Sequence, residues 1–213
     1  MLVERIKVGV IPAGSMGLAL AQLASERGHS VTAYFHHPEP LEEFKRTYRS
    51  KRLKGKRFAE DIRGTGNIRE AIEDMDVVFV VPPSAKFEEV FETAEPFFED
   101  GQDVGIGSKG LIRGTNSTIS QYILGRRPKM VDHLVVMSGP TLAREMVAHK
   151  ETGIVFASYN ERQVIKNKYP QVIIHESTVL TRKLTIGSSG SSATDIYKLP
   201  IRVQIDIHHS SAA

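Results

Sequence analysis

Two glycines three residues apart, Gly14 and Gly17, have a type and spacing that could bind a phosphate group. They lie in the segment Pro12-Ala13-Gly14-Ser15-Met16-Gly17, between an apolar run and an Ala/Leu-rich segment. A turn between a strand and a helix presents unpaired backbone N–H groups and the positive end of a helix dipole, which suits a dinucleotide pyrophosphate. Gly14 would let the backbone approach the phosphates, and Gly17 would let the helix pack close to the strand. A tight strand-to-helix connection without a ligand would show the same pattern.

Pro12 is a departure from the dinucleotide-binding fingerprint, because it stands where G-x-G-x-x-G has its first glycine. Proline fixes φ and removes a donor, but this position mainly shapes the turn, and the donors that face a ligand come later. Met16 could contact a cofactor or pack against the helix that follows the turn.

Alternating strands and helices are predicted to position this turn. Apolar and β-branched runs predict strands at 6–11, 30–35, 76–81, 103–107, 134–137, 153–157 and 172–175. Helices are predicted after the turn up to a Gly28 stop, and at 41–48, 68–74, 87–95, 142–148 and 161–169, with one more that is capped by Thr115 or Asn116 and ends at 124. This order predicts an α/β fold with a doubly wound, mostly parallel, Rossmann-like sheet.

Five loops follow strands in this prediction and are expected to lie along one edge of the sheet, where such folds bind ligands. They are residues 12–16, 36–37, 82–84, 108–110 and 138–141.

The predicted domains are a dinucleotide-binding domain at 1–176 and an atypical, linker-like tail at 177–213. The tail contains a Gly/Ser-rich stretch at 187–192, followed by strict alternation of apolar and polar residues within 199–208. This alternation predicts a half-buried strand that pairs with the sheet edge or with a partner, so a homodimer is conceivable.

Composition excludes several classes of protein. The 213 residues contain no cysteine, which excludes disulfides, thiolate zinc sites and a cysteine nucleophile and fits a cytoplasmic protein. No apolar run approaches the ~20 residues that span a bilayer, and the N-terminus does not resemble a signal peptide, so no membrane association is expected. No metal site is expected either, because the adjacent pairs His36-His37 and His208-His209 point apart on an extended chain.

Positive charge is concentrated in one segment. Residues 45–57 hold eight Lys or Arg and no acid, although the whole chain carries only +3. The segment is predicted to be a solvated helix and loop; the alternatives are that it reaches the adenosine ribose of a cofactor or binds nucleic acid. Nucleic acid is the least favoured partner, because only Tyr48 interrupts the cluster. No acidic residue stands directly after the strand at 30–35, which favours NADP(H), or equal use of NAD and NADP.

The loops together resemble the N-terminal, cofactor-binding half of NAD(P)-dependent sn-glycerol-3-phosphate dehydrogenases, over residues 6–175. The most specific matches are Ser108-Lys109-Gly110-Leu111 and Ser138-Gly139-Pro140-Thr141-Leu142-Ala143-Arg144-Glu145. The resemblance implies hydride transfer between NAD or NADP and a small phosphorylated three-carbon substrate, dihydroxyacetone phosphate or glycerol 3-phosphate. It places cofactor contacts at Gly14, Ser15, Met16, Gly17, His36, Lys109 and Ala143, and substrate contacts at Lys109, Gly139 and Thr141.

The family also carries an all-helical domain that supplies a catalytic lysine, and no such helix is recognised in this sequence. No catalytic residue is therefore assigned. The alternative is a catalytically inactive or truncated dinucleotide-binding module.

Overall fold

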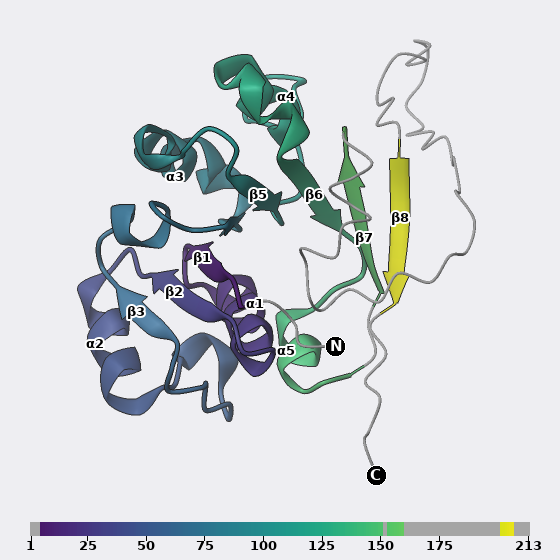
Figure 1. The fold of residues 1–213 in the computed structure, drawn as a ribbon. Helices are drawn as coiled ribbons and strands as arrows, with labels where there is room; N and C mark the ends of the chain where they lie inside the picture. Colours follow the sequence, from purple (N-terminus) through teal and green to yellow (C-terminus); the bar gives the residue numbers. More distant parts are fainter. Residues whose placement is uncertain (1–4, 151–152, 160–200, 207–213) are drawn as a thin grey trace.

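An eight-stranded sheet forms the centre of the computed structural model, which describes residues 5–150, 153–159 and 201–206 (Figure 1). The strand order is β3-β2-β1-β4-β5-β6-β7-β8. The strands are β1 Lys7–Ile11, β2 Ser30–Tyr34, β3 Arg63–Thr65, β4 Val77–Val80, β5 Asp103–Ile106, β6 Leu134–Ser138, β7 Gly153–Ser158 and β8 Ile201–Asp206.

The first six strands are parallel, while β7 pairs antiparallel with β6 and β8 antiparallel with β7. The predicted α/β fold with a mostly parallel, Rossmann-like sheet is thus confirmed. The strand order reverses between β1 and β4, and in such sheets the crevice at this point binds ligands.

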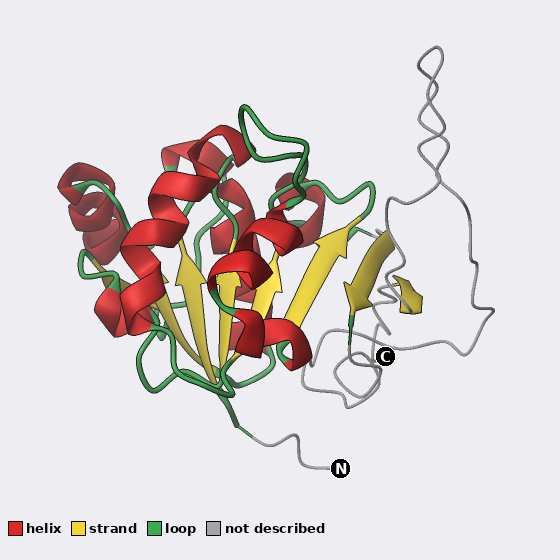
Figure 2. Cartoon of the chain, turned by 90° about the horizontal axis from the view of Figure 1, so that it is seen from above, coloured by secondary structure: helices red, strands yellow, loops and turns green. Residues whose placement is uncertain are grey.

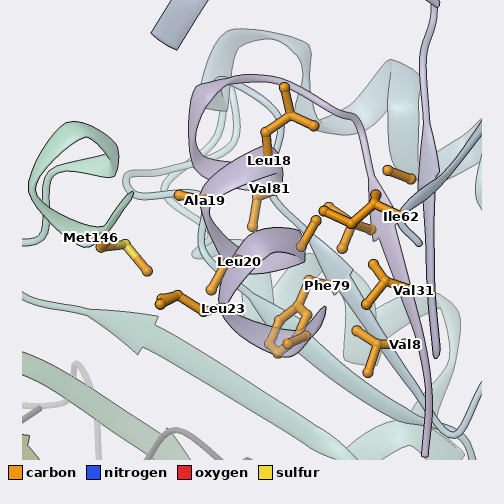
Figure 3. Close-up of a cluster of buried hydrophobic side chains, with 14 of the residues drawn as sticks. Val8, Leu18, Ala19, Leu20, Leu23, Val31, Ile62, Phe79, Val81 and Met146 are labelled. Carbon is orange, nitrogen blue, oxygen red and sulfur yellow. The ribbon is translucent and has the colours of Figure 1, made fainter. Parts of the chain in front are cut away.

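Helices cover both faces of the sheet (Figure 2). They are α1 Ser15–Glu26, α2 Pro38–Thr47, α3 Phe87–Ala94, α4 Ile119–Arg126 and α5 Ala143–Val147. The cluster of buried side chains on one face includes residues of α1, α2 and α5, and the cluster on the other face includes residues of α3 and α4. Figure 3 shows α1 against the sheet, with Met146 of α5 close to Leu23.

Strand β4 explains why the middle of the sheet is apolar on both faces. Its four residues are all buried. Val77 and Phe79 belong to the α1 side of the core, whereas Val78 and Val80 belong to the α3 side. The continuous apolar run in the sequence is therefore a strand buried on both faces, as predicted.

Two local predictions were wrong, and one strand was missed. The helix expected at 68–74 is only a 3₁₀ turn, Arg69–Ala71, which packs so closely that a Cβ on Gly9 of β1 would collide with the carbonyl oxygen of Ala71. The cap of α4 is Thr118, which forms a capping box with Gln121, and not Thr115 or Asn116. The short strand β3 was not predicted.

The strand predicted within 199–208 is present as β8, which joins the sheet edge beside β7. The predicted elements at 161–169 and 172–175 and the domain boundary at 176 lie outside the described residues. Among the described residues, no helix has the length and apolar character needed to cross a membrane.

Candidate functional site

The five loops after β1, β2, β4, β5 and β6 lie at one edge of the sheet, because these strands are all parallel. Four hydrogen bonds join the ends of these strands in spatial order. They run from Ala13 N to Tyr34 O at 2.6 Å, from Val81 N to Ile11 O at 2.7 Å, from Ser108 Oγ to Pro82 O at 2.5 Å, and from Lys109 Nζ to Gly139 O at 2.6 Å. Segments more than 100 residues apart in the sequence are thereby brought to the same edge of the sheet.

The turn between β1 and α1 presents an uncapped helix N-terminus at this edge of the sheet. Gly14 is the N-cap residue and offers no side-chain cap, and the first turn of α1 holds no acidic residue. The first hydrogen bond of the helix runs from Leu18 N to Gly14 O. The N–H groups of Ser15, Met16 and Gly17 therefore precede the first intrahelical bond and point toward a ligand position. An anion such as a pyrophosphate fits this arrangement.

Gly14 and Gly17 differ in their surroundings. A Cβ on Gly14 would have no atom within 4 Å, so open space adjoins the backbone there. A Cβ on Gly17 would collide with the carbonyl oxygen of Pro12 and lie 3.0 Å from Cγ1 of Val10. Gly17 is thus required for close packing of α1 on β1, as predicted, and Gly14 leaves room for a ligand.

Met16 and Ala143 are both partly buried and pack against the core on the α1 side. Helix α5 lies against α1, so Ala143, its first residue, is on the same side of the sheet as the Gly14 turn. The packing role considered for Met16 is present in the structure. Its contact with a cofactor stays a prediction, as does that of Ala143.

Lys109 is exposed on the loop after β5, and its ammonium group donates to the carbonyl of Gly139 on the loop after β6. Gly139 has φ +126°, a backbone conformation that favours glycine. Thr141 is partly exposed two residues later. The structure therefore brings Lys109 to Gly139, with Thr141 on the same loop, and their contact with a substrate stays a prediction.

The end of β2 carries aromatic and basic groups. The Tyr34 hydroxyl lies 3.3 Å from Nδ1 of His36, and the rings of His36 and His37 are 4.6 Å apart. Burial raises the pKa of Tyr34, so its hydroxyl keeps its proton near neutral pH. Glu89 of α3 has a pKa lowered mainly by its hydrogen bond to Lys86, with a smaller effect from the charge of His36. Both histidines are exposed directly after β2.

The basic side chains of segment 45–57 do not all lie at the end of β2. Lys56 pairs with Glu26, the last residue of α1, at 3.8 Å. Because α1 has 12 residues and is about 18 Å long, Lys56 lies far from the Gly14 turn. Lys51 folds back along α2 and pairs with Glu39 and Glu43. Lys56 therefore lies beside the C-terminal end of α1, and the alternative in which the basic segment reaches a bound ribose stays a prediction.

A shallow cavity of about 560 Å³ on the outer side of α2 is lined by charged residues of both signs, including Glu39, Glu43 and Lys51. Within residues 5–150, 153–159 and 201–206, no group of three or more His, Cys, Asp or Glu side chains could hold a metal ion.

No role for Ser108 is predicted from the sequence, although the residue begins the motif Ser108-Lys109-Gly110-Leu111. The signal that could have identified its role is a small polar residue at the end of a buried strand, followed directly by a lysine.

Comparison with known proteins places the site in context. The protein-family model described as "NAD-dependent glycerol-3-phosphate dehydrogenase N-terminus" matches residues 7–164 of this chain. The chain is 34% identical over 175 residues to "Glycerol-3-phosphate dehydrogenase [NAD(P)+] 2" of Lactobacillus delbrueckii subsp. bulgaricus, covering 80% of this chain and 51% of that protein. It is 33% identical over 156 residues to "Glycerol-3-phosphate dehydrogenase [NAD(P)+]" of Enterococcus faecalis, covering 72% and 46%. The chain thus spans about half the length of these relatives.

Solved structures share the fold. The crystal structure of glycerol-3-phosphate dehydrogenase from Coxiella burnetii superposes with a TM-score of 0.67 at 24% identity, covering 76% of this chain and 49% of that one. The enzyme from Saccharomyces cerevisiae gives a TM-score of 0.59 at 17% identity, covering 68% and 45%.

Proposed function

Because the chain belongs to the family of NAD-dependent glycerol-3-phosphate dehydrogenases, we propose that it binds NAD(H) or NADP(H) and takes part in interconverting dihydroxyacetone phosphate and sn-glycerol 3-phosphate. The observation that supports this proposal most strongly is the series of four hydrogen bonds that joins the Gly14 turn to Lys109 and Gly139 along one edge of the sheet. A cofactor and a small substrate could meet there.

The β1–α1 turn would hold the cofactor pyrophosphate. The N–H groups of Ser15, Met16 and Gly17 donate, and Gly14 leaves the approach open. Ala143 would contribute an apolar contact from the facing helix α5. The bound cofactor supplies the hydride-transfer chemistry.

Lys109 would bind the phosphorylated substrate. Its ammonium group donates to a neutral carbonyl, that of Gly139, and a phosphate or a carbonyl oxygen that gains negative charge is a stronger acceptor. Lys109 would also lie close enough to the cofactor to contact both ligands. The glycine at 139 lets the backbone approach the substrate, and Thr141 offers a hydroxyl group.

For the cofactor preference, we propose that NADP(H) is accepted at least as well as NAD(H). His36 and His37 stand directly after β2, where an acidic residue would repel a 2′-phosphate. The nearest carboxylate along the chain, Glu39, lies within 3.3 Å of Lys51. This pairing reduces its repulsion of an added phosphate.

The test is binding and turnover with purified chain. Binding of NADPH and NADH is measured by cofactor fluorescence, and turnover by loss of NADPH absorbance with dihydroxyacetone phosphate. Lys109→Gln should weaken substrate binding at least tenfold, since a hydrogen bond to a charged group contributes about 1.5–3 kcal/mol. The matched control is Lys129→Gln, which removes an exposed lysine that pairs with Asp100. Equal substrate binding by the two variants would contradict the site.

A second candidate function is a dinucleotide-binding module without turnover. The observation that favours it is the coverage of only about half of the relatives' length. NADPH binding without oxidation in the presence of dihydroxyacetone phosphate would support this candidate over the dehydrogenase.

Two further proposals concern the state of the protein. Strand β8 ends the sheet, and edge strands can pair with a second copy, so we propose a homodimer formed through this edge. Light scattering on the full chain tests it, and the molar mass of a single chain would contradict the dimer. We also propose a cytoplasmic location, which the absence of cysteine favours; fractionation of cells that produce the chain tests it.

A further inference from the structure

Ser108 is a buried serine that directly precedes Lys109. Its side chain is 8% exposed, and its Oγ donates to the carbonyl oxygen of Pro82 at 2.5 Å. The β4–β5 pairing ends at Val80 and Ile106, followed by one more hydrogen bond from Gly107 N to Val80 O at 3.2 Å. The serine hydroxyl therefore continues the contact between the two chains after the ladder of backbone hydrogen bonds has ended.

The backbone in front of Ser108 is held between the neighbouring strands. A Cβ on Gly107 would lie 2.7 Å from Cγ1 of Val81 and 3.2 Å from Cε of Met137. These side chains leave space for glycine only. The loop after β5 is thus confined by the ends of β4 and β6 before it reaches Lys109.

Two side-chain hydrogen bonds from adjacent residues then point in opposite directions along the sheet edge. Ser108 binds back to the loop after β4, and Lys109 reaches forward to Gly139 on the loop after β6. The first bond is buried and the second is exposed. A buried hydrogen bond is the more rigid anchor, because water cannot replace either partner.

We propose that Ser108 is a positioning residue: its hydrogen bond to Pro82 fixes the loop from which Lys109 reaches Gly139 and the phosphorylated substrate. The substrate part of this inference rests on the proposed function, whereas the placement of Lys109 does not. Removal of the hydroxyl leaves the buried Pro82 carbonyl without this donor, so the loop must shift or admit water to satisfy it.

The first measurement is the reactivity of Lys109 in the full chain. Reductive methylation with formaldehyde, followed by mass spectrometry, gives the labelling rate of each lysine. Ser108→Ala should raise the rate at Lys109 about fivefold, the loss of roughly one hydrogen bond, and leave Lys129 unchanged. Ser108→Thr keeps the hydroxyl and should restore the slow rate.

A matched control is Ser158→Ala. Ser158 is 1% exposed, and its Oγ donates to the carbonyl of Leu134, at the opposite end of β6, at 3.0 Å. This variant also removes a buried serine-to-carbonyl bond, but it should not alter the labelling of Lys109. An unchanged rate in Ser108→Ala, or an equal rise in Ser158→Ala, would overturn the proposal.

The second measurement is ligand binding by the same variants. Ser108→Ala should weaken binding of dihydroxyacetone phosphate about tenfold and NADPH binding by a smaller factor, because most of the proposed cofactor contacts lie on the β1–α1 turn and not on Lys109. A similar loss for both ligands would indicate general disruption and contradict a positioning role. If the unmodified chain does not bind dihydroxyacetone phosphate while the labelling of Lys109 still responds to Ser108→Ala, the proposed substrate fails and the positioning of Lys109 stands.

Discussion

Gly14→Ala and Gly17→Ala should have different effects although the two glycines lie in one turn. At Gly17 the added methyl group meets the carbonyl oxygen of Pro12 and Cγ1 of Val10, so α1 must move away from β1. Overpacking costs about 1–3 kcal/mol, and a clash with a backbone oxygen falls in the upper part of this range, about 2–3 kcal/mol, of which the higher helix propensity of alanine offsets about 1 kcal/mol. We expect Gly17→Ala to lower the free energy of unfolding by about 1–2 kcal/mol, or about 2–8 °C in Tm.

At Gly14 the added methyl group meets no atom, and φ is −80°, which alanine adopts readily. The free energy of unfolding should change by less than about 1 kcal/mol, because alanine restricts the unfolded chain but is less favourable than glycine at an N-cap, and the two effects oppose each other. The methyl group would instead occupy the space through which a pyrophosphate approaches α1. We expect NADPH binding to weaken at least tenfold, a loss of about 1.4 kcal/mol.

Urea denaturation followed by circular dichroism measures stability, and NADPH fluorescence measures binding. The chain contains no tryptophan, so the cofactor signal is free of tryptophan emission. The pair of variants separates the two effects: Gly17→Ala should lose stability together with cofactor binding, and Gly14→Ala should lose binding alone. Normal NADPH binding by a folded Gly14→Ala variant would refute the assignment of this turn as the pyrophosphate site.

Three other predictions concern buried and charged groups. His29 is 2% exposed, its Nδ1 accepts from Ile6 N, and burial, with a smaller effect from a neighbouring arginine, lowers its pKa. The unfolded state therefore binds the proton more tightly, so stability should fall as pH drops below about 6.5, and His29→Phe should reduce this dependence in urea titrations at pH 5–8. Gln102 is buried and donates to two backbone carbonyls, so Gln102→Leu should cost about 2 kcal/mol in urea denaturation, and an unchanged midpoint would contradict this role. His36→Gln/His37→Gln should lower the preference for NADPH over NADH, measured as the ratio of the two dissociation constants, because it removes the two rings that directly follow β2; an unchanged ratio would contradict their contact with the 2′-phosphate.

The strands of the sheet could be predicted from the sequence wherever one continuous apolar run forms one strand. Strand β4 is the clearest case, because alternate residues enter opposite cores and all four are buried. The 3₁₀ turn Arg69–Ala71 was not predictable, because its length is set by the close approach of Ala71 to Gly9 on another strand. Strand β3 has only three residues, Arg63–Thr65, which is too short to show a period.

The sequence predicts which loops form the site, but it does not predict the side-chain contacts between those loops. Parallel strands place their carboxyl ends together, so the convergence of the five loops followed from strand order alone. The bond from Lys109 to Gly139 depends on the reach of one side chain across 30 positions of sequence. The position of Lys56 beside Glu26 could not be predicted either, because the charge composition of a segment does not show how the chain returns along α1.

Pro12 can replace the first glycine of the fingerprint because the nearest donors are already used within the protein. Ala13 N donates to Tyr34 O at 2.6 Å, and Gly14 N donates to the carbonyl of Pro12 at 2.8 Å. The N–H groups left for an anion begin at Ser15, in the first turn of α1. A proline also restricts the turn before a ligand binds, which reduces the entropy lost on ordering it. The substitution therefore changes the stiffness of the turn and leaves its anion-binding donors in place.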